Sequence, residues 1–392
     1  MRRTMVRLVA LVSALALVAA CGDDVADTAT ATTIDAPATV QAEGDLPPAE
    51  QADLEAALVD VMERLDVPGA SVAVRTPDGT WQATAGVADL ETAAPITEDL
   101  TWPLRSITKS VAVTVLLQLV DEGLVDLDAT VDTYVEGVPD GDVITLRQLA
   151  AMTSGIGDYS QSEAFAEAYG EDPGRVFTLD ELNEIGYREG TQFEPGSDAV
   201  YSNTSTNVIG RVIEEVTGTT VDAAITERII EPLELSGTAY PTTVDDWPDH
   251  ASGYQPDDDG EIAPGPPNNF TVFGPAGAMI ATIGDLLTWA EALGSGSALS
   301  AAVHEERFDG RPLSEGPEYD AYGLGLGELS GWWGHTGEGL GYTALVMYDP
   351  ATGSAIAVGM NVSNETVEGA DGNPVSTHAP TEFFRQAAEI LA

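Results

Sequence analysis

The chain has 392 residues, which is enough for one large domain with an insertion or for two domains that share a cleft. Its 65 Asp and Glu residues outnumber its 15 Lys and Arg residues, so the formal net charge is −50 at pH 7. A field of this sign repels phosphate and argues against nucleic acids and anionic membrane surfaces as partners. The carboxylates are spread throughout, and we interpret them as a solvated surface, suited to high salt or shaped by genome composition.

The N-terminus has the pattern of a bacterial export signal. Arginines precede an apolar run over residues 8–20 that is too short to span a bilayer. The run ends at Ala20-Cys21-Gly22, similar to a lipobox, where a signal peptidase cuts before the cysteine and lipid is attached to it. We expect residues 1–20 to be a lipoprotein signal peptide, with Cys21 anchoring an exported protein at the outer face of the cell membrane or in the periplasm. The alternative is a secreted protein with an incidental cysteine.

Cys21 is also the only cysteine, so no internal disulfide can form. Residues 21–50 are rich in Ala, Thr, Asp and Pro with few large apolar side chains, which predicts a flexible linker. Apolar residues then recur at helical spacing from Leu54 to Leu65. Alternating residues at 70–75 and 81–87 flank a turn and predict a hairpin.

A second helix is predicted to begin near Ser106, behind Pro103, and to close at Gly123. A long helical and loop region follows to about residue 270. The remaining predicted elements are a helix at 285–293, strands at 342–348 and 354–361, and a terminal helix at 382–391.

Strands at both ends of the chain with helices between them predict an α/β (α+β) fold. We expect an antiparallel sheet flanked by N- and C-terminal helices, built from residues 51–105 and 271–392. Residues 106–270 are expected to form a mostly helical inserted domain.

Lys109 is the only lysine in the chain, and it follows Ser106 by three positions. Residues three apart lie on one face of a helix, so the amine can approach the serine oxygen. A serine hydroxyl is a poor nucleophile until a base removes its proton, and a desolvated lysine can be neutral and act as that base. The positive end of the helix dipole would also favour an oxyanion at the serine. Alone, the Ser-x-x-Lys pattern is a weak signal.

Two further motifs strengthen it. Tyr201-Ser202-Asn203 places a phenol and an amide after a turn, and His335-Thr336-Gly337 precedes a predicted strand. With these three motifs in order, the chain resembles the serine β-lactamase and DD-peptidase superfamily over about residues 52–392. It is most similar to the branch of class C β-lactamases, DD-carboxypeptidases and related esterases, and the resemblance implies a β-lactamase/transpeptidase-like fold.

The resemblance also implies a role for each motif residue. Ser106 looks like the acylated nucleophile and Lys109 like its base or proton relay. Tyr201 looks like a second proton carrier, ionised or hydrogen-bonded to the lysine, and Asn203 is similar to the amide that holds substrate and lysine. The third motif matches the strand lining the cleft, which implies a catalytic role for His335 and substrate contacts for Thr336, Gly337 and Glu338. The backbone N–H groups of Ser106 and Glu338 would form the oxyanion hole.

The third motif departs from most β-lactamases of the superfamily, because His335 stands where they carry lysine. This departure favours peptidase or esterase activity over efficient β-lactam hydrolysis. We expect a serine acyl-enzyme hydrolase that acts first as a D-alanyl-D-alanine carboxypeptidase, with a β-lactamase or an esterase as alternatives. A non-catalytic lipoprotein that binds the cell wall is the alternative from another class.

The remaining candidates have simpler interpretations. We expect Arg105 to be a surface residue, and His250, His304 and His378 show no partner pattern. Four histidines and one cysteine give no metal-ligand spacing, so no metal and no cofactor are expected. The expected partners are a small-molecule or peptide substrate and, through the lipid anchor, the membrane. The oligomeric state stays open.

Overall fold

A computed structural model describes residues 40–244, 247, 249–257, 260–363, 365–368 and 374–392. The predicted signal peptide and Cys21 lie outside this part of the chain. The C-terminal end of the predicted linker differs from the expectation. Residues Val40–Gly44 form strand β1, which pairs with β3, and helix α1 begins at Pro48. Pro48 suits this start because proline lacks only an N–H that the first turn of a helix leaves unbonded.

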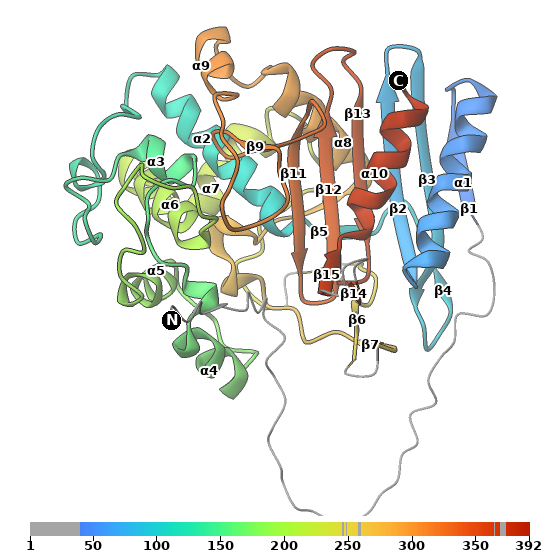
Figure 1. Ribbon diagram of the computed structural model, residues 1–392, viewed down its shortest axis with the longest axis horizontal. Helices are drawn as coiled ribbons and strands as arrows, with labels where there is room; N and C mark the ends of the chain where they lie inside the picture. Colours follow the sequence, from blue (N-terminus) through green and yellow to red (C-terminus); the bar gives the residue numbers. More distant parts are fainter. Residues whose placement is uncertain (1–39, 245–246, 248, 258–259, 364, 369–373) are drawn as a thin grey trace, which may run out of the picture.

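The centre of the fold is an antiparallel sheet drawn from both ends of the chain (Figure 1). Its strands follow the spatial order β1-β3-β2-β13-β12-β11-β10-β9, and β4 pairs with β3. The strands are β1 Val40–Gly44, β2 Gly69–Thr76, β3 Gly79–Asp89, β4 Ala94–Pro95, β9 Ala321–Tyr322, β10 Gly327–Leu329, β11 Trp332–Gly339, β12 Tyr342–Tyr348 and β13 Ala355–Met360. The β2–β13 pair joins the N-terminal and C-terminal parts, with Val72 opposite Val358.

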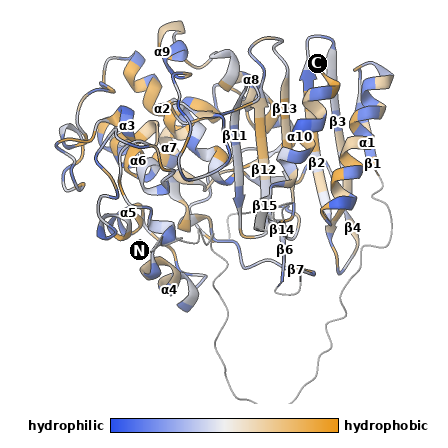
Figure 2. Ribbon diagram, viewed as in Figure 1, coloured by the Kyte–Doolittle hydropathy of each residue, from blue (hydrophilic) through white to orange (hydrophobic). Residues whose placement is uncertain are grey.

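Helices α1 (Pro48–Arg64) and α10 (Ala379–Ile390) lie side by side on one face of this sheet (Figure 1). Both helices carry polar and apolar residues along their length (Figure 2), which is the pattern of a helix that covers a core. Phe383 and Phe384 of α10 are at most 1% exposed. Burying each such side chain contributes about 1.5–3 kcal/mol.

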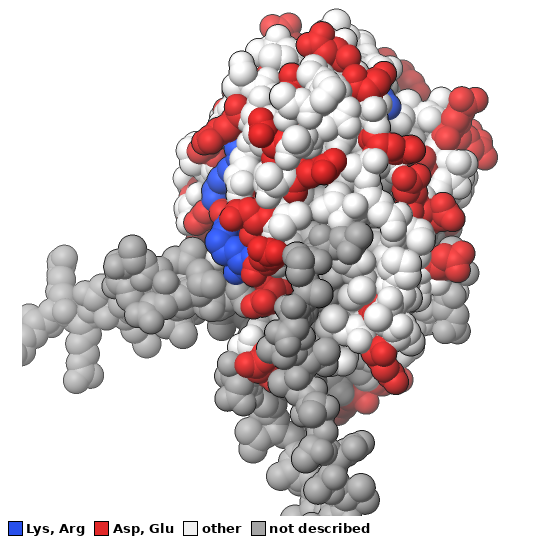
Figure 3. Space-filling view, turned by 90° about the vertical axis from the view of Figure 1, so that its right-hand side faces the viewer, with Lys and Arg blue, Asp and Glu red and all other residues white. Residues whose placement is uncertain are grey.

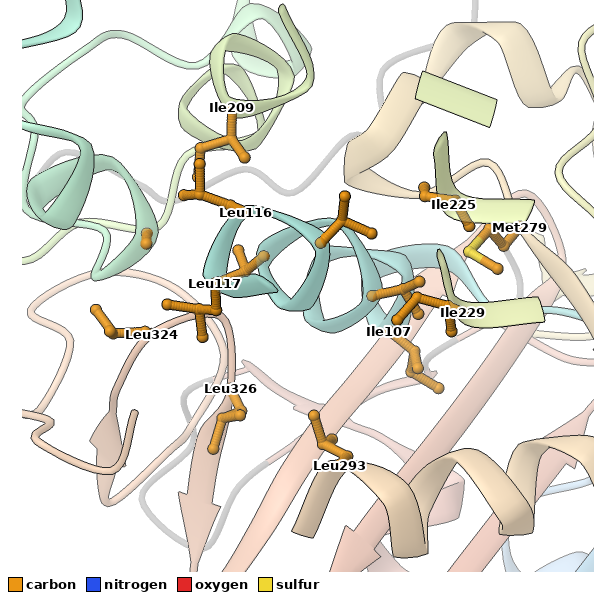
Figure 4. Packing of buried hydrophobic residues seen from close by; sticks show 14 of the residues in the cluster. Ile107, Leu116, Leu117, Ile209, Ile225, Ile229, Met279, Leu293, Leu324 and Leu326 are labelled. Atoms are coloured by element: carbon orange, nitrogen blue, oxygen red, sulfur yellow. The ribbon is translucent and has the colours of Figure 1, made fainter. Parts of the chain in front are cut away.

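The other face of the sheet packs against α8 (Ile283–Ser295). Beyond α8, the helix α2 (Thr108–Asp121) runs through the largest apolar cluster. Figure 4 shows Leu116 and Leu117 of α2 among residues from distant segments, including Ile209, Met279 and Leu326. The two ends of this helix are therefore held by surrounding packing, which fixes the residues at its start.

The remaining helices lie mostly beside the sheet. They are α3 Leu146–Ala150, α4 Glu163–Glu171, α5 Leu179–Arg188, α6 Asn203–Thr217, α7 Val221–Ile225 and α9 Ala301–Glu306. Three two-stranded ribbons complete the described elements. They are formed by β5 Thr101–Pro103 with β8 Ile280–Thr282, β6 Tyr254–Pro256 with β7 Ile262–Pro264, and β14 Glu365–Glu368 with β15 Pro374–Thr377. The mixed fold with an antiparallel sheet confirms the predicted fold class.

The local sequence pattern places His335-Thr336-Gly337 ahead of a strand, which is wrong. These residues lie within β11, which pairs with β12, as the family resemblance implies. The sequence of β11 is rich in glycine, which has little preference for extended structure, so local propensity does not indicate a strand there.

The described surface is acidic. Carboxylates are scattered over the face shown in Figure 3, and basic side chains are few there. No helix in the described part of the chain is both long and apolar enough to cross a bilayer.

Candidate active site

Ser106 lies at the start of α2, in the 3₁₀ turn Arg105–Ile107 that leads into the helix. Leu104, the residue before this turn, donates its N–H to Met279 O at 2.8 Å, and Thr108 Oγ accepts the Met279 N–H at 3.2 Å. These bonds attach both sides of the turn to the segment before β8. The serine is partly exposed, whereas most residues of α2 are buried.

The Lys109 amine is fully buried and has three oxygen neighbours. Its Nζ lies 3.1 Å from Ser106 Oγ, 2.6 Å from Asn203 Oδ1 and 2.7 Å from Ala276 O. The predicted spacing of Ser106 and Lys109 thus places the two side chains in contact. Burial lowers the pKa of Lys109 from 10.5 to about 7, and the negative charge of Asp158 opposes part of this change.

The arrangement around the amine determines what it can do when neutral. The amide oxygen of Asn203 and the carbonyl of Ala276 can only accept hydrogen bonds, so they take two N–H groups. The remaining position on the nitrogen faces Ser106 Oγ. In the neutral amine this position is the lone pair, which can accept the serine proton.

Asn203, the first residue of α6, is itself held by hydrogen bonds. Its Nδ2 donates to Asp158 Oδ2 and to Ser160 Oγ, both at 3.0 Å. Because these two acceptors fix the amide nitrogen, the amide oxygen must face Lys109. Burial raises the pKa of Asp158, while the nearby Lys109 and the Ser160 N–H act in the opposite direction.

Ala276 is positioned from the same helix. One turn after Asn203, the Asn207 side chain accepts the Ala276 N–H at 3.2 Å. The carbonyl of Ala276 then faces Lys109. Helix α6 therefore supplies one acceptor of the amine directly and holds the other in place.

Tyr201 packs its ring against the amine, with Lys109 Nζ 4.8 Å from the ring centre. Its phenol oxygen is buried and has no hydrogen-bond partner among the described residues. Burial raises the pKa of Tyr201 well above 10, and the adjacent Ser106 hydroxyl opposes this only in part. The expectation of a phenolate, or of a phenol bonded to the lysine, is therefore wrong. The group is a neutral hydroxyl with a proton to donate.

His335 lies in β11 and is fully buried, behind the site. Its Nδ1 lies 2.6 Å from Thr336 O, which can only accept, so this nitrogen carries the proton and Nε2 accepts from Tyr322 Oη at 3.1 Å. Burial and the charge of Lys109 lower the pKa of His335 to about 3. The predicted catalytic role of His335 is therefore not supported, because both ring nitrogens are bonded within the protein and the ring stays neutral.

The rest of the third motif faces the site. Thr336 is partly exposed, and its Oγ lies 2.7 Å from the Tyr319 hydroxyl, which also accepts the Thr336 N–H at 2.8 Å. At Gly337 a Cβ would lie 2.1 Å from Leu104 O, so only glycine lets β11 approach the Ser106 turn this closely. Glu338 follows and is partly exposed.

Arg105 is not a surface residue. Only 1% of it is exposed, and it bonds to Gly339 O and Asn268 Oδ1. Sequence reasoning missed its burial, and it also missed Asp158, Ser160 and Asn207. A usable signal was the position of the loop 157–160 directly after residues 149–156, which also resemble the family. Among the described residues, no three His, Cys, Asp or Glu side chains gather as a metal site requires.

Comparison with known proteins agrees with this geometry. The family model described as Beta-lactamase matches residues 54–379. A D-aminopeptidase from Brucella anthropi is 31% identical over 241 residues, covering 60% of this chain and 44% of the relative. Esterase EstB from Burkholderia gladioli is 30% identical over 190 residues, covering 45% of this chain and 48% of the esterase. The chain thus spans about half the length of these relatives.

Among solved structures, a D-stereospecific amidohydrolase from Streptomyces sp. is similar over nearly its whole length. It superimposes with a TM-score of 0.72 at 32% identity, covering 80% of this chain and 94% of the amidohydrolase. The match of the family model to most of the described residues, together with the assembled Ser106–Lys109 pair, shows that the chain belongs to the Beta-lactamase family.

Proposed function

We propose that this protein is a serine hydrolase that cleaves amide bonds formed by the carboxyl group of a D-amino acid, through an acyl-enzyme on Ser106. The observation that carries the proposal is the Lys109 amine. It is buried, bonded to two fixed acceptors, and faces Ser106 Oγ at 3.1 Å with its third position. A base with a pKa of about 7 is suited to proton transfer near neutral pH.

The reaction follows from these positions. Ser106 Oγ attacks the carbonyl carbon while its proton passes to Lys109 Nζ. The C–N bond then breaks, and the leaving nitrogen takes the proton that Lys109 received from Ser106. Water attacks the resulting ester and gives a proton to Lys109 Nζ, which passes a proton to Ser106 Oγ as the acid is released, so that the Ser106 hydroxyl is regenerated. The backbone N–H groups of Ser106 and Glu338 stabilise the oxyanion.

Two lines of support favour a D-aminoacyl substrate with a free ammonium group. A D-aminopeptidase and a D-stereospecific amidohydrolase are the relatives described above. The ionisable side chains that are partly exposed at the site include the carboxylates Asp158 and Glu338, whereas the cationic Arg105 is buried. With a net charge of −50, such a site attracts cationic substrates and repels anionic ones.

D-alanyl-D-alanine carboxypeptidase activity is the second candidate, and Thr336 favours it. The Tyr319 hydroxyl accepts the Thr336 N–H and shares a second hydrogen bond with Thr336 Oγ, in which either oxygen can donate. When Tyr319 donates, the threonine hydroxyl can donate to a substrate carboxylate at this partly exposed position. In both candidates the attacked carbonyl belongs to a D-amino acid. The two substrates differ in their charged group. The D-aminoacyl substrate carries a free ammonium on the acyl side of the scissile bond, whereas the D-Ala-D-Ala peptide carries a free carboxylate on the leaving side.

The test is a direct comparison of substrates. D-alanine and L-alanine p-nitroanilides, a peptide ending in D-Ala-D-Ala, nitrocefin and a short-chain p-nitrophenyl ester are assayed in parallel at low and high salt. We expect turnover of the D-anilide with at least a tenfold preference over its L enantiomer. Faster cleavage of the D-Ala-D-Ala peptide would select the carboxypeptidase, and turnover of only the ester or nitrocefin would reject both amide proposals.

The nucleophile assignment has its own control. Ser106→Ala should lose all labelling by a fluorophosphonate probe. Ser110→Ala, four residues on in the same helix, removes a buried hydroxyl bonded to Ile107 O and Trp289 and should keep the labelling. If Ser106→Ala is labelled like the wild type, the nucleophile is elsewhere. If the wild type is never labelled and turns over no substrate at any salt, a non-catalytic, cell-wall-binding role takes its place.

We further propose that the mature protein is exported and anchored through lipid on Cys21, as the N-terminal sequence predicts. Palmitate labelling of the full chain in a bacterial host should be lost in Cys21→Ser. Equal labelling of the two proteins would reject the anchor.

A further inference from the structure

Arg105, the residue before the nucleophile, has an unusual backbone and an unusual environment. Its φ angle is +48°, in the left-handed region that residues with a Cβ rarely adopt. Its side chain is 1% exposed. Strained conformations of this kind persist only where surrounding contacts fix them, and they gather at functional sites.

The guanidinium is held by neutral groups. Its Nε donates to Gly339 O at 3.0 Å, and Nη2 donates to Asn268 Oδ1. Its carbon lies 4.6 Å from the ring centre of Phe273 and 5.4 Å from that of Phe270, within the range of cation–π attraction. The third nitrogen, Nη1, is buried with no hydrogen-bond partner among the described residues.

The charge of Arg105 is also unbalanced locally. Eight other described arginines each form an ion pair with a carboxylate. Within the described residues Arg105 forms none, although the chain carries 65 Asp and Glu residues. Burial lowers the pKa of Arg105 to about 9, which leaves the side chain charged at neutral pH. A buried, charged group without a counter-ion costs free energy. Arg307 is in the same state, but Arg105 differs from it in lying directly beside the nucleophile.

The position of Arg105 links the two backbone segments of the proposed oxyanion hole. Its own carbonyl belongs to the peptide whose N–H is that of Ser106. Its side chain holds the carbonyl of Gly339, the residue after Glu338. On the other side of Glu338, the Gly337 carbonyl accepts from His378 Nε2 at 3.2 Å. The carbonyls of Gly337 and Gly339, the residues before and after Glu338, are therefore held by the side chains of His378 and Arg105.

We propose that Arg105 is a positioning residue that sets the spacing between the Ser106 and Glu338 N–H groups. It also keeps a buried positive charge close to these two groups. The inference rests on the proposed acyl-enzyme function. An oxyanion hole stabilises charge that develops only in the transition state, so its donors must be placed before the reaction. Arg105 ties the turn that carries one donor to the strand that carries the other, with a planar group that lysine cannot replace.

The experiment compares Arg105→Lys and Arg105→Gly with the wild type. Glycine relieves the left-handed φ angle and removes the guanidinium, whereas lysine keeps the charge but not the two-pronged contact. Steady-state kinetics on the preferred substrate, the rate of fluorophosphonate labelling and product inhibition by the free D-amino acid are measured for each variant. The phosphonyl oxygen of the probe enters the oxyanion hole, whereas the product acid tests ground-state binding.

We expect Arg105→Gly to lose about 100-fold in kcat and in labelling rate, with KM and product inhibition changed less than threefold. Arg105→Lys should lie between this variant and the wild type. Arg307→Lys is the matched control. Arg307 is also buried and bonded to two carbonyls, those of Leu324 and Ser110, and its change should lower thermal stability without this selective loss.

A folded Arg105→Gly that labels at the wild-type rate would overturn the inference. A parallel loss in kcat, KM and product affinity would also overturn it, because it would show a collapsed site. If the wild type labels but does not cleave D-amides, only the substrate assignment fails, and the labelling rates still decide the role of Arg105. If the wild type does not label, the proposed function fails and the inference falls with it.

Discussion

Lys109 and His335 are two buried nitrogen bases in neighbouring parts of the site, and burial has nearly the same effect on both. It lowers the pKa of Lys109 from 10.5 to about 7 and that of His335 from 6.5 to about 3. The same cost of desolvation brings the amine to neutrality and takes the imidazole out of the physiological range. The ordinary pKa of the group therefore decides which buried base can exchange protons near pH 7.

Their partners differ as well. Lys109 faces the partly exposed Ser106 hydroxyl, so its proton has a route to the substrate. Both nitrogens of His335 are bonded to groups of the protein, including Tyr322 Oη and Thr336 O. Lys109 is thus placed to carry chemistry, and His335 to hold β11 against the tyrosines.

The largest expected effect is the loss of Ser106 acylation when Lys109 is replaced, which distinguishes Lys109 from His335. Lys109→Arg keeps the charge but removes the base, because arginine keeps its proton in proteins. We expect acylation of Ser106 to slow by about 10³–10⁴-fold, the upper part of the range for general base catalysis. Stopped-flow labelling of the folded variant measures this rate. Loss of less than tenfold would show that another group removes the serine proton.

The same amine should couple stability to pH. Its pKa is lower in the folded than in the unfolded chain, so the unfolded chain binds the extra proton between pH 7 and 10.5. The free energy of unfolding should therefore rise with pH across this window, by up to about 5 kcal/mol, with the full penalty present below pH 7. Urea denaturation of wild type and Lys109→Met isolates the contribution, since the variant should lack this rise. Parallel pH profiles would contradict the lowered pKa.

A smaller effect on activity is expected at His335. His335→Gln keeps a donor and an acceptor at the position, so kcat/KM should fall less than tenfold and the kinetic pKa should not move. Stability should fall by about 1–3 kcal/mol, because the Tyr322 and Thr336 groups lose well-placed partners. Thermal unfolding and a pH–rate profile are the measurements. A changed pH profile would restore a catalytic role for His335.

The smallest expected effect concerns the carboxylate behind Asn203. The charge of Asp158 raises the pKa of Lys109, so Asp158→Asn should lower the kinetic pKa of acylation. Activity should then extend to lower pH, with a loss below tenfold on the alkaline side, where the amine is already neutral. Ser160→Ala, which removes a neighbouring acceptor of Asn203 without changing the charge, is the matched control. A kinetic pKa that stays constant or rises would contradict the coupling.

Much of the fold could be predicted because local patterns report it directly. Helical spacing at Leu54 and Leu58 indicated α1, and alternation with a turn indicated the β2–β3 hairpin. The spacing of Ser106 and Lys109 was equally informative, since residues three apart in a helix meet whatever surrounds them. The local pattern did not indicate β11, because its glycines carry no apolar alternation, and only the family resemblance placed the third motif on a strand.

The rest of the site depends on contacts between distant segments. Arg105 is buried by Phe273 and Asn268, more than 160 residues later, and nothing beside it in the sequence indicates this. Asp158 is one of 65 acidic residues, and only its contact with Asn203 distinguishes it. The Ala276 acceptor is a backbone carbonyl, which any residue would carry.

The pairing of β2 with β13 also constrains how the molecule is made. Residues 69–76 leave the ribosome long before their partners at 355–360 exist, so the middle of the sheet cannot close during most of synthesis. Pairings this distant in sequence form slowly, and until they form the apolar edge of β2 stays unpaired and prone to aggregate. Loss of the last forty residues would remove both β13 and α10, and β12, which pairs with β13 and contacts the Ser106 turn, would lose this support.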